Sequence, residues 1–238
     1  MKTHRKTRVA LAVAGAAALV AAGSAAYAHS TWVVAAGGVT TGTVAYTTTA
    51  TGTSSNPAVA FTAGAAHMTC ESASSSGDVF LGTTGTTPPG GPTPPVGYYS
   101  NIQGITFDTC LAEGVLPMEV TEAATVANPW KVDITGDKFV PVPPDTRANR
   151  SPIQIYAIHA HIQDIGTAGG TCGMDVDGTV NGIVNSDDQK LEVLTADSGL
   201  VVSKVTGGCF GLTSNFDRAT FAGVFDVANA VGPITFDH

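Results

Sequence analysis

Short runs rich in β-branched and aromatic side chains recur along the chain after residue 28, and in some of them apolar and polar residues alternate. Residues 221–227 illustrate this, because Phe221, Phe225 and Val227 fall on one set of alternate positions. A period of two places such side chains on one face of an extended strand. Helical periods are nearly absent, and Gly or Pro interrupts the runs at short intervals. The pattern therefore predicts an antiparallel all-β fold.

The runs between these interruptions define the expected strands. They cover residues 31–35, 39–48, 58–62, 67–71, 102–108, 118–126, 130–134, 153–163, 171–176, 179–184, 190–194, 200–205, 219–227 and 234–236. Many short strands separated by turn residues are typical of a β-sandwich.

Two Pro-rich segments, residues 83–96 and 141–151, interrupt the strand texture. Pro supplies no backbone donor, so we expect both segments to be loops outside the sheet. The second segment separates possible halves at 29–140 and 152–238. These are either two packed halves of one sandwich or two small β domains.

Four cysteines, Cys70, Cys110, Cys172 and Cys209, lie in the second and larger part of the chain. An even number in an exported protein indicates disulfides, and four cysteines allow three pairings. We favour Cys70–Cys110 and Cys172–Cys209, because each bridge then closes a loop within its own half. The spacings do not resemble a zinc site, which usually has two close pairs.

Residues 1–28 have the composition of a signal peptide. Four basic residues precede an apolar stretch from Val9 to Ala22, and Ala26-Tyr27-Ala28 matches a cleavage signal. The apolar stretch is short for a membrane anchor. We therefore expect a secreted domain over residues 29–238, with no membrane span after cleavage.

The charge of residues 29–238 limits the partners. They carry seven bases against nineteen acids, a formal net charge of −12. Such a surface repels nucleic acid and anionic lipid, so neither is expected as a partner. The expected partner is an unknown extracellular ligand or a component of the cell envelope.

A series of short motifs spans nearly all of residues 29–238. They are Trp32-Val33-Val34, Cys70, Phe107-Asp108-Thr109-Cys110, Pro129-Trp130-Lys131-Val132, Gly170-Thr171-Cys172, Gly208-Cys209-Phe210-Gly211-Leu212, Asp217-Arg218-Ala219-Thr220-Phe221-Ala222-Gly223 and Pro233-Ile234-Thr235. Their order resembles that of a group of uncharacterised actinobacterial (Streptomyces-type) secreted proteins. The resemblance implies a secreted all-β fold with two disulfides, and it implies no activity. The Pro-rich residues 83–96 depart from the compact version of this pattern.

Histidines supply one hypothesis for a metal site. Cleavage after Ala28 would make His29 the N-terminal residue, whose amine and ring can chelate copper together with a second His. His159 and His161 lie two positions apart on an expected strand and so share a face. The alternative is that both are surface residues of an open sheet face, with Ile158, Ala160 and Ile162 in the core behind them. His67 is a further candidate ligand.

Asp175, Asp177 and Asn181 supply a second hypothesis, a calcium site, since hard cations bind several oxygens on a tight turn. The EF-hand spacing fails, because Ser186 occupies the twelfth position. The alternative is a hairpin turn at Asp177-Gly178, a common turn dipeptide.

Catalytic and cofactor motifs are not found. The chain contains no Gly-x-Ser-x-Gly or His-Glu-x-x-His sequence. Asp187-Asp188 could belong to a glycosidase pair, but the simpler interpretation is a solvated turn. Trp32 and Trp130 could stack on sugars, and we expect them in the core. The sequence favours a non-enzymatic binding or structural protein. A metal-binding protein, a hydrolase acting on polysaccharide or envelope polymer, and a carrier for a small apolar molecule remain as alternatives.

Overall fold

A computed structural model describes residues 31–85, 99–136, 149–165, 172–195 and 198–237. The described residues form antiparallel strands and one short 3-10 helix, which confirms the all-β class. The segment 1–28, His29 and most of both Pro-rich segments lie outside them. Within this described part, no helix is long and apolar enough to span a membrane.

Most strands begin and end within four residues of the predicted positions, whereas the strand predicted over residues 118–126 ends at Thr121. The strands are β1 (Thr31–Ala36), β2 (Gly42–Thr51), β3 (Val59–Ala63), β4 (Ala66–Gly85), β5 (Ser100–Ala112), β6 (Leu116–Thr121), β7 (Trp130–Ile134), β8 (Arg150–Asp164), β9 (Gly173–Asn185), β10 (Lys190–Val193), β11 (Leu200–Thr206), β12 (Arg218–Asn229) and β13 (Ile234–Asp237), with helix η1 (Gly207–Gly211) between β11 and β12.

Two strands depart most from their predicted lengths. β4 extends to Gly85, because β5 pairs with it over residues 68–79, β2 over residues 72–81 and β1 over residues 82–85. β9 joins two predicted strands into one, since β8 pairs with it along almost its whole length. Ladder pairing on both edges overrides the weak strand propensity of the residues inside.

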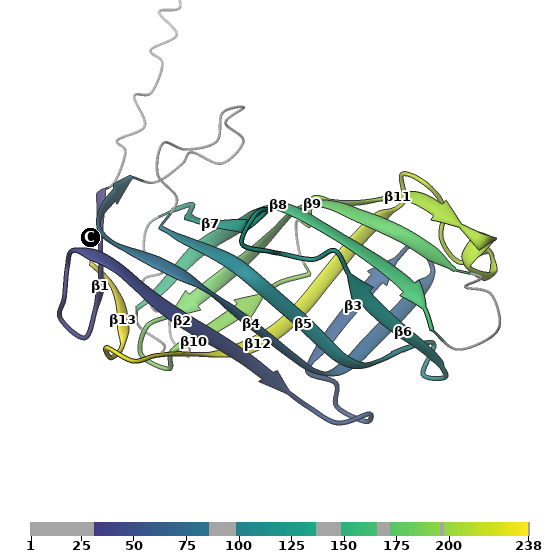
Figure 1. Cartoon of the computed structure of the whole chain (residues 1–238), viewed down its shortest axis with the longest axis horizontal. Helices are drawn as coiled ribbons and strands as arrows, with labels where there is room; N and C mark the ends of the chain where they lie inside the picture. Colours follow the sequence, from purple (N-terminus) through teal and green to yellow (C-terminus); the bar gives the residue numbers. More distant parts are fainter. Residues whose placement is uncertain (1–30, 86–98, 137–148, 166–171, 196–197, 238) are drawn as a thin grey trace, which may run out of the picture.

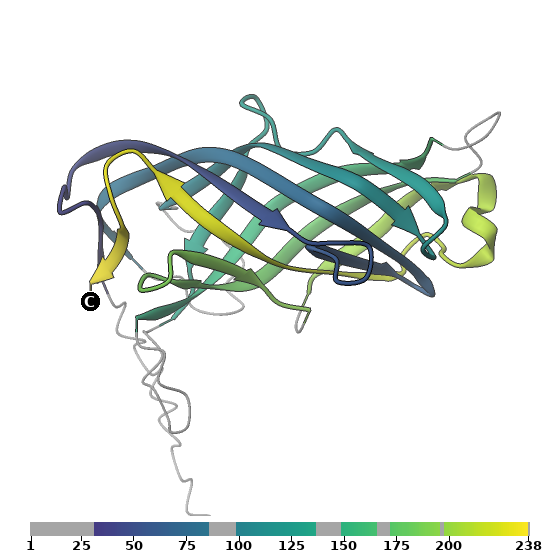
Figure 2. The ribbon, with the colours of Figure 1, turned by 90° about the horizontal axis from the view of Figure 1, so that it is seen from below.

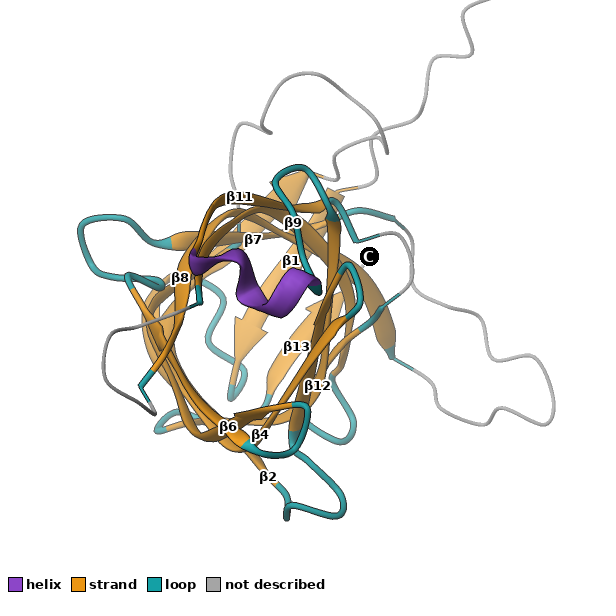
Figure 3. Ribbon diagram, turned by 90° about the vertical axis from the view of Figure 1, so that its right-hand side faces the viewer, coloured by secondary structure: helices purple, strands orange, loops and turns teal. Residues whose placement is uncertain are grey.

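The strands form one 13-stranded antiparallel sheet. Its path runs β4-β2-β12-β10-β9-β8-β6-β5, and β5 also pairs with β4, so the pairing returns to its start. Figure 1 and Figure 2 show the strands crossing the long axis obliquely, and Figure 3 shows them surrounding an interior. Register shifts in the β4–β5, β8–β9 and β11–β9 ladders accommodate this curvature, because bulges bend strands and increase their twist.

The β-sandwich expectation is not confirmed, because the described strands make a single sheet. Strands on either side of residues 141–151 pair directly: β12 with β2 and β3, and β8 with β6 and β7. These ladders cross from one predicted half to the other and leave no separate second sheet. The apolar face of a sheet must be buried, and a curved sheet does this by packing its inner face against itself instead of against a second sheet.

Alternate side chains from these strands fill the interior. Trp32, Ile134, Ile153 and Phe236 are almost fully buried, and Trp130 is also in the core as predicted. Both predicted disulfides are present, at Cys70–Cys110 and Cys172–Cys209. Two disulfides indicate folding in an oxidising, extracellular type of environment.

Candidate functional site

The two predicted metal candidates meet on the outer face of β8 and β9. The register places His159 directly opposite Asp177, and His161 opposite Asp175. In each pair the His Nδ1 lies 2.6 Å from the Asp Oδ1. The alternation predicted that the two histidines share a face. It did not predict that they face the two aspartates.

Each aspartate also has a partner on β11. Lys204 Nζ lies 2.7 Å from Asp175 Oδ2, and Ser203 Oγ donates to Asp177 Oδ2 at 3.2 Å. Burial alone would raise the pKa of the Asp175 carboxyl, whose side chain is 6% exposed. The hydrogen bonds from Lys204 and His161 outweigh that effect, so the pKa is lowered. The same hydrogen bond raises the pKa of Lys204.

These contacts fit a cross-strand polar network that joins β8, β9 and β11. Both aspartates use their oxygens on neighbouring side chains, and Glu122 lies 3.8 Å from His159 Nε2. Within the described ranges, no group of three or more His, Cys, Asp or Glu residues is placed to hold a metal ion. The copper hypothesis also involves His29, which lies outside these ranges, and it stays a prediction.

The hairpin turn expected at Asp177-Gly178 is wrong, because both residues lie within β9. Gly178 has a φ of +138°, and it pairs with Ile158 next to a register shift in β8. A side chain at Gly178 would collide with the carbonyl oxygen of Gly199, so Gly serves a close approach of two backbones here. Asn181 lies beyond Gly178 on β9 and accepts a hydrogen bond from Gln154.

The Asp187-Asp188 pair lies in the turn between β9 and β10, where both residues are exposed, as the solvated-turn interpretation predicted. Asn185 Nδ2 donates to Asp188, and Asn149 Nδ2 donates to Asp187. These contacts give both acids a local role in the turn.

An apolar pocket lies on the inside of the sheet, at the end where β3, β6 and η1 meet. Its volume is about 340 Å³, within the usual range for small-molecule sites. Figure 3 looks onto this end, with η1 lying across it. The lining is mostly apolar: Phe61, Ala66, His67, Met68, Ala112, Glu113, Val115, Leu116, Met118, Ile162, Cys172, Met174, Cys209 and Leu212.

Three methionines contribute to this pocket from three different strands. Met68 on β4, Met118 on β6 and Met174 on β9 are all buried and are the only methionines after Met1. Met is flexible and polarisable, so it adapts to ligands of irregular shape. A methionine wall can therefore adjust to apolar ligands of different shapes, whereas a rigid wall would fit only one.

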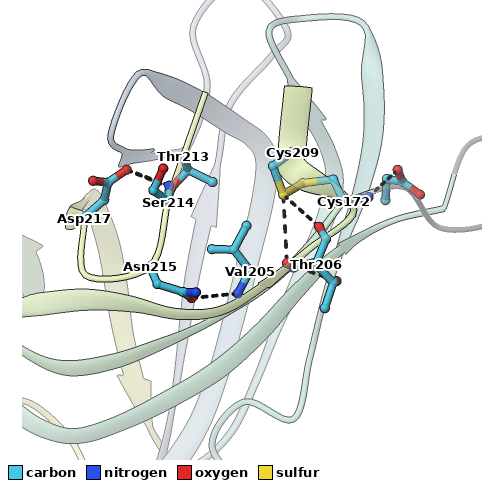
Figure 4. Close-up of a disulfide and its surroundings, with 10 residues drawn as sticks. Cys172, Val205, Thr206, Cys209, Thr213, Ser214, Asn215 and Asp217 are labelled. Atoms are coloured by element: carbon cyan, nitrogen blue, oxygen red, sulfur yellow. Dashed lines mark hydrogen bonds between the residues drawn. A yellow bond between two sulfur atoms is a disulfide. The ribbon is translucent and has the colours of Figure 1, made fainter. Parts of the chain in front are cut away.

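The Cys172–Cys209 disulfide holds η1 at this end of the sheet (Figure 4). Both cysteines line the pocket. The chain after η1 is anchored locally, since Asn215 Oδ1 accepts from the Val205 N–H at 2.9 Å and Asp217 accepts from the Ser214 N–H at 2.7 Å. The disulfide therefore connects the end of the pocket to β9.

A smaller cavity of about 70 Å³ lies deeper in the interior and shares Phe61, Met68 and Ile162 with the pocket. Its lining is apolar apart from Thr48 and Ser75. Their hydroxyls are 2.7 Å apart and satisfy each other, so this polar pair does not disturb an apolar interior.

Comparison of the chain with protein-family models, with curated proteins and with solved structures gives no match. The candidate site is therefore interpreted from its own geometry. The pocket residues were not predicted individually, because inward positions of a strand follow the same alternation whether the space between them is filled or hollow.

Proposed function

We propose that this protein is an extracellular, non-enzymatic binding protein that carries a small apolar molecule in the pocket between β3, β6 and η1. The observation that supports the proposal most is the apolar lining of a cavity of about 340 Å³. Small-molecule sites are typically concave, mostly apolar and lined by a few polar groups. His67 and Glu113 are the ionisable residues of this lining.

The arrangement of the lining favours binding over hydrolysis. Polysaccharide hydrolysis normally uses two carboxyl groups that flank the scissile bond. The residues that line this pocket include one carboxylate, Glu113. A carrier needs no second one, because it only transfers a molecule from water to an apolar interior.

The proposed extracellular location is supported by residues 1–28, which have the composition of a signal peptide, and by the two disulfides. The resemblance to actinobacterial secreted proteins agrees with this location. The acidic balance keeps such a protein soluble and away from anionic surfaces.

The test uses N-phenyl-1-naphthylamine, an uncharged probe whose fluorescence rises in apolar surroundings. The full chain is expressed, and the disulfide-bonded protein is titrated with the probe. We expect saturable binding, and we expect Leu116→Trp to weaken it at least tenfold by filling the pocket. Val126→Trp is the matched control, because Val126 is 78% exposed and does not line the pocket. Absence of saturable binding, or equal binding by both variants, would refute the proposal.

A further inference from the structure

A carboxylate, that of Glu113, lies at the rim of the apolar pocket, where the polar end of a ligand would lie. Glu113 lies in the turn between β5 and β6 with a φ of +50°, and Val115 N–H donates to the Ala112 carbonyl in the same turn. Glu113 Oε1 accepts from the His67 backbone N–H at 2.8 Å. That bond links the β5–β6 turn to the beginning of β4 and fixes a carboxylate at the rim.

The pocket is apolar below this rim and polar at it. His67 and Glu113 are exposed and are the ionisable residues among the described ones that line the pocket; the His67 ring lies beside Thr62, whereas its backbone N–H binds Glu113. Met68, Met118 and Met174 are buried beneath them. An occupant that satisfies both regions has an apolar body and one polar end.

The charge at the rim selects among polar ends. A carboxylate ligand would place its charge beside that of Glu113, and like charges repel each other. The acidic balance of residues 29–238 adds to this repulsion at longer range. An uncharged hydroxyl or a cationic amine meets no such cost, and both can donate a hydrogen bond to a carboxylate.

The shape of the interior beyond the pocket favours some apolar ligand shapes over others. The central cavity of about 70 Å³ continues inward from Phe61, Met68 and Ile162, which line both spaces. Met68, one of the three shared residues, is unbranched and flexible, so a linear chain could pass between the two spaces more readily than a fused ring.

From these four observations we infer that the ligand is a single-chain amphiphile with a hydroxyl or amine end group. Its end group lies at Glu113 and its chain points inward past Met68. This inference rests on the proposed function and assigns the chemical class of its ligand.

The experiment is competition against N-phenyl-1-naphthylamine by dodecanol, dodecylamine and dodecanoate at pH 7, below their aggregation concentrations. The three compounds share one chain, so a difference in affinity reports the end group. We expect the alcohol and the amine each to bind about tenfold more tightly than the carboxylate. Glu113→Gln should bring the carboxylate to within about twofold of the alcohol, because it removes the charge and keeps the shape.

Glu122→Gln is the matched control, because Glu122 is an exposed acid on the outer face that does not line the pocket. It should leave the order of affinities unchanged. A series of alcohols should also gain about fourfold in affinity for each added CH₂ until the interior is filled. Equal affinities for the three end groups, or an unchanged order in Glu113→Gln, would overturn the inference about the end group. Loss of affinity with chain length would overturn the inference about the chain.

The two proposals fail in different ways. If wild-type protein does not bind the probe, the carrier function itself is refuted. If the probe binds and Leu116→Trp blocks it while the end groups are not distinguished, the function stands and the assigned ligand class is wrong.

Discussion

Removal of the Cys172–Cys209 disulfide should weaken the fold and the pocket together. The bridge closes a loop with a sequence separation of 37 residues, and the Cys70–Cys110 bridge closes one of 40. The loop-entropy relation gives about 4 kcal/mol for either loop. Since small domains are stable by about 5–15 kcal/mol, each loss would be large but would leave a folded population.

The two bridges differ in what else holds their strands. Cys70 and Cys110 are direct partners in the β4–β5 ladder, whose backbone pairs remain on both sides when the bridge is removed. Cys172 precedes β9, and Cys209 lies in η1, which belongs to no ladder. The structure at the pocket end therefore depends on Cys172–Cys209 more than the structure around β4 depends on Cys70–Cys110.

The assay compares the double variants Cys172→Ala/Cys209→Ala and Cys70→Ala/Cys110→Ala by urea unfolding and by titration with N-phenyl-1-naphthylamine. Both variants should lose about 4 kcal/mol in the free energy of unfolding. Probe affinity should fall about tenfold or more in the first variant and less than threefold in the second. Equal affinities in the two variants would refute the assigned role of η1. A loss below about 1 kcal/mol in both would refute the loop-entropy argument.

Three further perturbations test the sheet and its polar contacts. Gly178→Ala should lower the free energy of unfolding by about 2 kcal/mol or more, because its methyl group would collide with the Gly199 carbonyl at a positive φ; urea unfolding measures this, and an unchanged midpoint would contradict the close approach. Thr48→Val alone should cost about 1–3 kcal/mol by leaving the Ser75 hydroxyl without its partner, whereas the double variant with Ser75→Ala should cost less than the sum of the two single variants; simple additivity would count against a coupled pair. Asp175→Asn should destabilise the protein at neutral pH, and the difference should disappear as the pH falls below about 4. The lowered pKa of Asp175 in the folded state gives stability above the unfolded pKa, and this stability is lost on acidification. Unfolding at a series of pH values measures this, and a difference that persists at low pH would refute it.

Most strands were predictable because the alternation of apolar and polar residues is visible within each strand's own sequence. In β8, Ile158, Ala160 and Ile162 are buried while His159 and His161 are more exposed, as the alternation predicts. β4 was largely missed for a physical reason. Residues 72–77 are Ser-Ala-Ser-Ser-Ser-Gly, which have little strand propensity, and they are extended because β2 and β5 supply hydrogen bonds on both edges.

The prediction of a turn at Asp177-Gly178 was wrong for a similar reason. The dipeptide favours a turn in isolation, but the ladders of β9 with β8 and β11 hold it in a strand. The glycine is used for its close approach to Gly199 instead. Local preference and long-range pairing compete at such positions, and only the local preference is visible in the sequence.

The outer face of β8 and β9 carries polar residues that are easily recognised in a sequence, whereas the inner face carries ordinary apolar ones. His161 and Asp175 are outward-facing, chemically distinctive and easily recognised, yet their contacts are with each other and with Lys204. The adjacent residues Ile162 and Met174 point inward and line the pocket. Because successive residues of a strand face opposite sides, a polar network on one face can hold the strands in register while the other face binds a ligand. The polar residues of β8 and β9 therefore bridge neighbouring strands on the outer face, and the contacts of the proposed ligand lie on the inner face.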